Sequence, residues 1–226
     1  KVLLRDIPGL YGIRDVQELN SLFTAIAYNS ACEFSLEALS KNSGVQKNTI
    51  KKYIEYLEAA FLIKVVHKTS HKPRNFQRAT QFKIYLTNPS LRCALFSPMQ
   101  PTDALIGNMV ENAIYSQWLH RDRFTLFYAR WARGEVDIVK LDEKKLRPEW
   151  VVEIKWSNHY YEKPTDLKPL LSFLKENGLT SALVTTLDKE GVRVADGVTL
   201  FFMPASVYAY TVGINTIHDE TMNQNQ

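Results

Sequence analysis

The sequence predicts a mixed α/β (α+β) protein built from two domains. Apolar residues recur at helical spacing through the first sixty residues, and the second half carries runs of branched apolar residues typical of strands. With 226 residues and 45% hydrophobic content, the chain is long enough to bury a substantial core. We assign residues 1–95 to the first domain, 96–213 to the second, and the polar residues 214–226 to a disordered tail.

The first domain is predicted to contain helices followed by two strands. Ser35 is the expected N-cap of the second helix, because its hydroxyl can accept an N–H from the first turn, and Asn42-Ser43-Gly44 is expected to end that helix after Lys41. The predicted helices span residues 15–29, 36–41 and 46–60, and the predicted strands span 61–66 and 82–86. This succession is typical of a winged helix-turn-helix.

Basic residues in the first domain predict contact with DNA. In a helix-turn-helix the N-terminal end of the third helix meets DNA, and Lys and Arg concentrate between Lys41 and Lys83. The candidate DNA-binding residues come from that helix and from the loop between the strands: Gln46, Lys47, Asn48, Lys51, Lys52, Lys72, Arg74 and Arg78. The alternative is that these lysines are simply solvated and that the module binds protein.

Charge also differs between the two halves of the chain. Residues 1–100 carry 14 Lys and Arg against 7 Asp and Glu, a net charge of +7, whereas residues 101–226 carry 14 against 17, a net charge of −3. A basic half followed by a mildly acidic half indicates two modules with different surfaces.

The second domain is predicted to run helix, three strands, helix, strand. Pro164 and Thr165 are expected to start its second helix and Gly178 to end it. The predicted helices span residues 104–119 and about 165–177, and the predicted strands span 124–130, 135–141, 150–156 and 181–187. The charged residues 142–147 are expected to connect two of these strands as a hairpin.

Two of these strands carry acidic residues that suit a metal-dependent nuclease. Asp137 lies in one strand, and Glu153 and Lys155 share a face of the next because strand side chains alternate. Mg²⁺ prefers carboxylate oxygens, so we predict Asp137 and Glu153 as ligands of Mg²⁺ or Mn²⁺. Lys155 is the predicted catalytic cation. Glu111 on the preceding helix is either a further acidic group of the site or a solvated helix carboxylate. An exposed ion pair on an edge strand would produce the same short pattern by chance.

The spacing of Asp137 and Glu153-Ile154-Lys155 resembles the PD-(D/E)xK nuclease superfamily, with Val136 in place of the usual proline. The resemblance implies a restriction-endonuclease-like or Holliday-junction-resolvase-like αβββαβ domain.

The whole chain is similar to the C-terminal region of a family of bacterial and archaeal AAA+-type ATPases that ends in a domain of unknown function. The similarity rests on Arg5-Asp6-Ile7-Pro8, on residues 49–58, and on the segments around Gly134-Glu135-Val136-Asp137 and Glu153-Ile154-Lys155-Trp156. It implies an N-terminal ATPase domain as partner, absent here. The chain has no Gly-x-x-x-x-Gly-Lys-Ser/Thr loop, so this fragment is not expected to bind ATP. It begins at Lys1 without an initiator methionine, which also indicates a fragment.

Other features of the sequence favour a cytoplasmic location. No apolar run approaches membrane-spanning length, so no membrane partner is expected. Cys32 and Cys93 lack a partner pattern and are expected to stay reduced. Three functions fit these observations: a metal-dependent DNA nuclease, an inactive nuclease-like module that binds DNA or regulates the ATPase, and a protein-interaction module.

Overall fold

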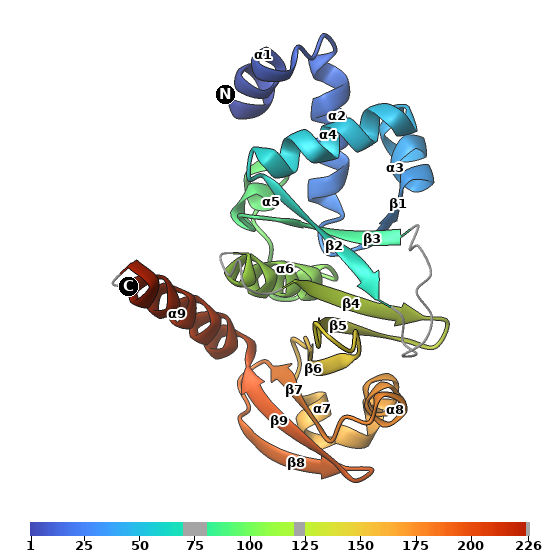
Figure 1. Ribbon diagram of the computed structural model, residues 1–226, viewed down its shortest axis with the longest axis vertical. Helices are drawn as coiled ribbons and strands as arrows, with labels where there is room; N and C mark the ends of the chain where they lie inside the picture. Colours follow the sequence, from blue (N-terminus) through green and yellow to red (C-terminus); the bar gives the residue numbers. More distant parts are fainter. Residues whose placement is uncertain (70–80, 120–124, 225–226) are drawn as a thin grey trace. The chain divides into compact units, whose positions relative to one another are not determined.

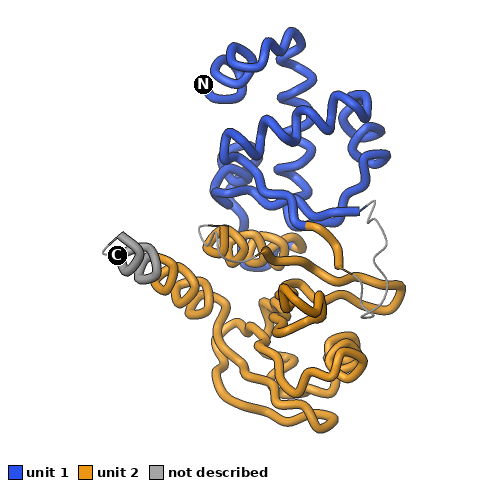
Figure 2. The backbone as a smooth tube through the Cα atoms, viewed as in Figure 1, with its two compact units in different colours: residues 1–66, 80–103 blue, residues 67–79, 104–226 orange. Residues whose placement is uncertain are grey.

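The computed structural model describes residues 1–69, 81–119 and 125–224, with side chains described as far as residue 216. The protein is mixed α/β, with a large mixed sheet and several helices, which confirms the predicted class (Figure 1). It divides into two compact units, residues 1–66 with 80–103 and residues 67–79 with 104–226 (Figure 2).

The first unit is mainly helical. Its elements are η1 (Val2–Asp6), α1 (Ile7–Tyr11), α2 (Val16–Tyr28), β1 (Glu33–Ser35), α3 (Leu36–Ser43), α4 (Lys47–Ala59), the part of β2 (Ile63–Thr69) up to Val66, β3 (Gln81–Leu86) and α5 (Ser90–Leu95). Side chains of α2, α4 and β3 form its core, including the fully buried Leu19, Leu22, Ile26, Ile50, Leu57 and Ile84. In α2 and α4, apolar residues at helical spacing thus line the buried face.

The start of α3 at Leu36 is the predicted one, and its end at Ser43 lies two residues beyond the predicted end at Lys41. Ser35 Oγ accepts a hydrogen bond from Ala38 N at 3.1 Å, and Gly44 closes the helix in the left-handed conformation with φ of 75°. The predicted strand over 61–66 starts later, at Ile63, because Phe61 has φ of 55° and donates its N–H to Glu58 O in a turn after α4. Phe61 is consequently 82% exposed.

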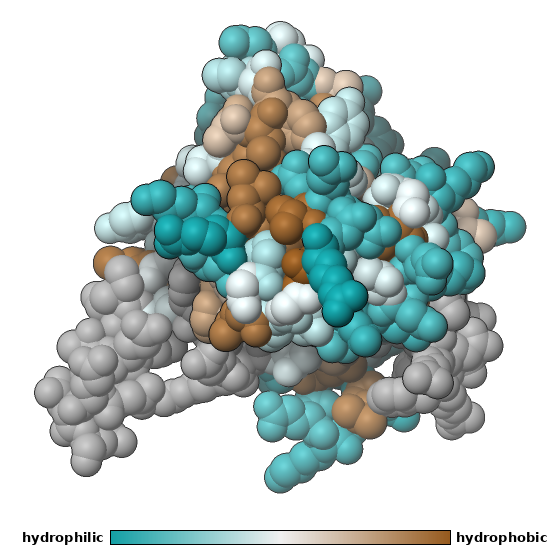
Figure 3. Space-filling view, turned by 90° about the horizontal axis from the view of Figure 1, so that it is seen from above, coloured by the Kyte–Doolittle hydropathy of each residue, from teal (hydrophilic) through white to brown (hydrophobic). Residues whose placement is uncertain are grey.

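Some apolar side chains of the first unit stay on its surface. Leu4 is 63% exposed and Leu10 is 76% exposed. Figure 3 shows apolar and polar side chains mixed on the face that it draws.

The second unit is built around strands in the order β4-β5-β6-β7-β9-β8. Its elements are α6 (Ile106–Trp118), β4 (Leu126–Trp131), β5 (Gly134–Leu141), β6 (Pro148–Glu153), α7 (His159–Glu162), η2 (Pro164–Asp166), α8 (Lys168–Asn177), β7 (Ser181–Thr186), β8 (Gly191–Ala195), β9 (Val198–Pro204) and α9 (Ala205–Gln224). β4, β5 and β6 pair antiparallel, β6 and β9 each pair parallel with β7, and β8 pairs antiparallel with β9. Apolar residues of α8 pack with those of β5, β7 and β9 in the main core of this unit.

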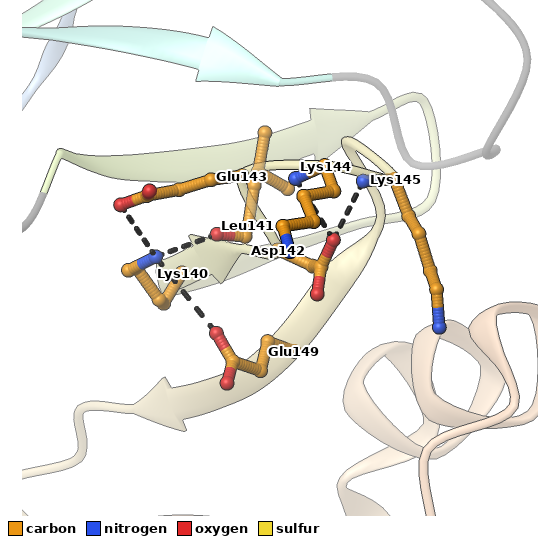
Figure 4. A network of polar contacts seen from close by, with 7 residues as sticks. All are labelled: Lys140, Leu141, Asp142, Glu143, Lys144, Lys145 and Glu149. Carbon is orange, nitrogen blue, oxygen red and sulfur yellow. Dashed lines mark hydrogen bonds and ion pairs between the residues drawn. The ribbon is translucent and has the colours of Figure 1, made fainter.

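A tight hairpin joins β5 to β6, as predicted (Figure 4). Asp142 donates its N–H to Arg147 O at 2.8 Å, and Asp142 Oδ1 accepts the N–H groups of Lys144 and Lys145 at 3.0 and 2.6 Å. Beside the turn, the buried Lys140 donates from Nζ to Leu141 O at 2.7 Å.

Several predicted boundaries in the second unit differ from the observed ones. The helix expected from 165 starts at Lys168, because Pro164–Asp166 form a separate 3₁₀ turn, whereas its predicted stop at Gly178 is confirmed by a left-handed φ of 69°. The strand expected over 150–156 ends at Glu153. The strand expected over 181–187 ends at Thr186, after which β8, β9 and α9 follow without having been predicted.

The C-terminal region also differs from the expected tail. α9 continues through residues 214–224, where neither Pro nor a further Gly interrupts the helical backbone after Gly213. In the part of the chain that the structure describes, no helix is both long and apolar enough to cross a membrane. Cys32 and Cys93 are free cysteines.

Candidate metal centre

β5 carries a β-bulge at its acidic residues. Phe127 pairs with Val139, and Ala129 pairs with Val136. The chain therefore advances two residues on β4 but three on β5 between these pairs, so β5 holds one extra residue. Val136 and Val139 both enter the core of the second unit, and the bulge between them contains the buried Asp137. A bulge redirects the side chains beside it and is common next to active sites.

Asp137 also fixes the end of β6. Its Oδ2 accepts the N–H of Ile154, the residue that follows the last residue of β6, at 2.8 Å. One residue further, the Lys155 N–H donates to Thr185 Oγ1 at 2.8 Å, and that hydroxyl donates to Lys155 O at 2.9 Å. Side chains of β5 and β7 thus replace the sheet bonds, which explains why the strand ends at Glu153 and leaves Lys155 beyond it.

Three carboxylates gather at this bulge. Glu111 of α6 and Glu135 and Asp137 of β5 each offer an oxygen, and these oxygens all lie within 4.8 Å of one another. Oxygen ligands lie about 2.0–2.6 Å from Mg²⁺ or Ca²⁺, so one cation fits between oxygens at this separation. Glu111 and Asp137, both predicted site residues, are buried, and Glu135 is partly buried.

Glu135 was missed as a site residue by the sequence analysis. The motif directs attention to Asp137 and to the ExK triplet, and Glu135 belongs to neither. Strand alternation would have pointed to it, because residues two apart on a strand face the same side.

Glu153 lies beside these three carboxylates, and only one of its two carboxylate oxygens has a partner among the described residues. Its Oε1 lies 2.6 Å from Lys155 Nζ, whereas its buried Oε2 has no hydrogen-bond partner among the described residues. Burial raises the pKa of Glu153 to about 8, the charges of Asp137 and Glu135 add to the rise, and Lys155 opposes it. A buried oxygen without a partner is costly, and a cation would supply the partner.

Lys155 keeps its positive charge in this setting. Burial lowers the pKa of Lys155, but the charges of Glu153 and Asp137 outweigh burial and raise it above its ordinary value. The ammonium also lies 5.8 Å from the centre of the Tyr160 ring. The site therefore holds a fixed cation next to its carboxylates.

The charges of the site leave room for a divalent cation. Four carboxylates, those of Glu111, Glu135, Asp137 and Glu153, face the cation of Lys155 and that of Arg130, whose Nη1 lies 3.4 Å from Glu135 Oε2. With every one of these groups ionised, as Glu153 is above the pH of its raised pKa, their formal charges sum to −2, which one Mg²⁺ or Mn²⁺ would neutralise. Carboxylate donors are those that these hard ions prefer.

The candidate DNA-binding residues of the first unit lie on the surface. Those at the N-terminal end of α4 are all exposed: Gln46, Lys47, Asn48, Lys51 and Lys52. Lys47 Nζ pairs with Glu37 Oε1 of α3 at 2.7 Å, so part of its charge is already balanced. The remaining candidates, Lys72, Arg74 and Arg78, lie outside the described residues.

Comparison with known proteins gives little functional information. Residues 1–102 match the model of a family described as a domain of unknown function (DUF8612). A curated relative, the uncharacterized protein MJ1544 of Methanocaldococcus jannaschii, is 24% identical over 153 residues, which cover 64% of this chain and 33% of the relative. The chain thus spans about a third of that relative's length. No solved structure matches the chain.

Proposed function

We propose that the second unit cleaves phosphodiester bonds of DNA with Mg²⁺ or Mn²⁺ at the candidate metal centre. The observation that carries this proposal is the gathering of Glu111, Glu135 and Asp137 within 4.8 Å, beside a Glu153–Lys155 ion pair with an unsatisfied buried oxygen. A structural ion pair needs one carboxylate, so the additional acidic groups favour a cation-binding role.

The order of elements supports the same proposal. α6, the antiparallel strands β4, β5 and β6, then α8, and then β7 parallel to β6 follow the αβββαβ order that the superfamily resemblance implies. We therefore propose a PD-(D/E)xK nuclease-like fold for this unit and a winged helix for the first.

In this mechanism the carboxylates and Lys155 have separate tasks. Glu111, Glu135 and Asp137 would hold the cation, with the second oxygen of Glu153 as a further ligand. The bound cation supplies a lowered pKa for an attacking water and neutralises phosphate charge. Lys155, held by Glu153 at 2.6 Å, orients that water or stabilises the negative charge that develops on the phosphate.

A nuclease assay on single-stranded, nicked and branched DNA with Mg²⁺ or Mn²⁺ tests this proposal. We expect wild-type cleavage, and a loss of about 100-fold or more in Asp137→Ala and in Lys155→Ala, because each removes charge stabilisation at the reacting phosphate. Glu190→Gln, which changes an exposed carboxylate of the same unit, should cleave normally. Absence of wild-type cleavage, or cleavage that survives both substitutions, would exclude the nuclease and leave an inactive module that binds DNA or protein.

We also propose that α4 binds DNA, because its exposed N-terminal end presents Lys47, Lys51 and Lys52 together. Changing all three to Gln should weaken DNA binding by about 10-fold or more. The slope of log affinity against log salt concentration should become shallower by roughly 0.9 for each phosphate that a lysine no longer neutralises. The control changes three exposed lysines of the second unit, Lys168, Lys175 and Lys189, with the same reduction in charge. Equal affinity in the two triple variants would remove α4 as the DNA-binding helix.

The relation to an ATPase is a proposal that rests on the sequence resemblance alone. In it, the chain is the C-terminal DNA-processing region of a cytoplasmic AAA+-type ATPase. The test is ATP hydrolysis by the full-length protein with and without DNA. A full-length protein that does not hydrolyse ATP would contradict it.

A further inference from the structure

Glu135 lies where two positive groups can bind its carboxylate. One of its oxygens belongs to the group within 4.8 Å that includes Glu111 and Asp137, where a cation would bind, and its Oε2 lies 3.4 Å from Arg130 Nη1. Arg130 and Glu135 are direct partners in the β4–β5 ladder, so the backbone holds the two side chains opposite each other.

The Arg130–Glu135 pair has the character of an exchangeable contact. The Arg130 side chain is 46% exposed and that of Glu135 is 26% exposed, so water screens the attraction between them. By contrast, Asp137 is buried and uses Oδ2 to accept a backbone N–H. Unlike Asp137, Glu135 can thus change partner without leaving an unpaired buried charge, because the half-exposed Arg130 can turn toward solvent.

We propose that Glu135 is a ligand of the cation and that Arg130 is a positioning residue that balances Glu135 while the cation is absent. The cation and Arg130 then compete for one carboxylate. This inference rests on the proposed metal centre and adds to it a ligand outside the D…ExK motif and a built-in competitor.

A purely structural role for the pair predicts different behaviour. A cross-strand ion pair that only supports the sheet would affect stability, and its removal would leave cation affinity unchanged or reduced through disorder. Competition predicts the opposite sign, namely tighter cation binding when Arg130 is neutralised.

Calorimetric titration of the whole chain with Mn²⁺, without DNA, separates these cases. We expect Glu135→Gln to weaken Mn²⁺ binding about 10-fold or more and Arg130→Met to tighten it several-fold, with Arg130→Lys closer to wild type than Arg130→Met. The matched controls are Glu190→Gln and Arg147→Met, which change exposed residues of the same unit and should bind Mn²⁺ as wild type does.

A double variant distinguishes competition from a general change of charge. If Arg130 acts through Glu135, the gain from Arg130→Met disappears in the Glu135→Gln background. A gain that persists there, or no gain in the single variant, overturns the role given to Arg130.

Mn²⁺ binding by Asp137→Asn distinguishes a failure of this inference from a failure of the proposed metal centre. Loss of Mn²⁺ binding in Asp137→Asn with normal binding in Glu135→Gln overturns this inference and keeps the metal centre. Wild-type binding in Asp137→Asn overturns the metal centre itself.

Discussion

Glu153 is a residue at which the fold opposes ionisation. Its burial and the nearby charges of Asp137 and Glu135 raise its pKa to about 8 in the folded chain, against an ordinary value of 4.5. Between these pH values the folded state keeps a proton that the unfolded state releases. The proton on Glu153 therefore adds to the free energy of unfolding. This contribution is fully present below pH 4.5 and is lost as pH rises through about 8.

Replacing Glu153 by Gln should remove this pH dependence. In EDTA, the variant should be more stable than wild type by about 1–3 kcal/mol at about pH 9, because Gln carries no charge to bury. The difference should shrink toward zero near pH 5, where wild-type Glu153 is largely protonated in the folded chain. Urea unfolding between about pH 5 and pH 9 measures it, with Glu190→Gln as control. A difference that is constant with pH would contradict the assignment to Glu153.

Gly134 is a position at which packing permits no side chain. A Cβ there would lie 2.4 Å from Pro169 Cβ, which is shorter than carbon atoms approach one another. Gly134→Ala should therefore destabilise the protein by about 1–3 kcal/mol through overpacking between β5 and α8. Gly107→Ala is the control, because a Cβ at that helical position meets nothing within 4 Å and should be neutral or stabilising. Thermal unfolding of both variants gives the comparison, and equal midpoints would be inconsistent with it.

At the scale of elements, the β5–β6 hairpin sets the register that brings Asp137 beside Glu153. The antiparallel pairs Val139–Val151 and Ile138–Val152 continue the ladder from the turn toward the site. At the turn, Asp142 Oδ1 accepts two backbone N–H groups (Figure 4). Leu146, in the same turn, takes a positive φ of 52°. The polar side chain of Asp142 thus supports a turn whose position determines which residues face each other at the candidate metal centre.

Asp142→Ala should cost about 1 kcal/mol of stability, because two backbone N–H groups lose their acceptor but can still reach water. Glu143→Ala is the matched control, because the Glu143 side chain is 81% exposed and its ion pair with Lys140 Nζ is long, at 4.0 Å. Its effect should lie within about 0.5 kcal/mol of zero. Urea unfolding tests both, and a cost for Glu143→Ala as large as that for Asp142→Ala would argue against the role of the turn.

Elements with strong local signals were predictable from the sequence, and those that depend on distant partners were not. Ser35 and Gly44 mark the ends of α3 through local chemistry, so that helix was predicted almost correctly. The end of β6 depends on contacts with Asp137 and with Thr185, and Thr185 lies thirty residues beyond its partner Lys155. Likewise, Glu111 was only a candidate until the fold placed it within 4.8 Å of Glu135 and Asp137.

At the scale of the whole molecule, the charges of the two halves act oppositely on DNA. The basic first hundred residues would attract phosphate, whereas the carboxylates of the candidate metal centre would repel it unless a cation neutralised them. For an ordinary basic protein, a divalent cation weakens DNA binding, because it competes for phosphate. A protein that binds the cation within its own DNA-binding surface should show the reverse.

We therefore expect Ca²⁺, a hard oxygen-binding cation, to strengthen DNA binding several-fold over EDTA at constant ionic strength. Asp137→Asn should bind DNA slightly better than wild type in EDTA, since it removes a negative charge, and should gain little from Ca²⁺. Fluorescence anisotropy measures the affinity, and a gel of the probe verifies that it stays uncut. If Ca²⁺ weakened binding equally in both proteins, the carboxylates would not meet DNA through a cation. DNA binding would then depend on the basic first unit alone.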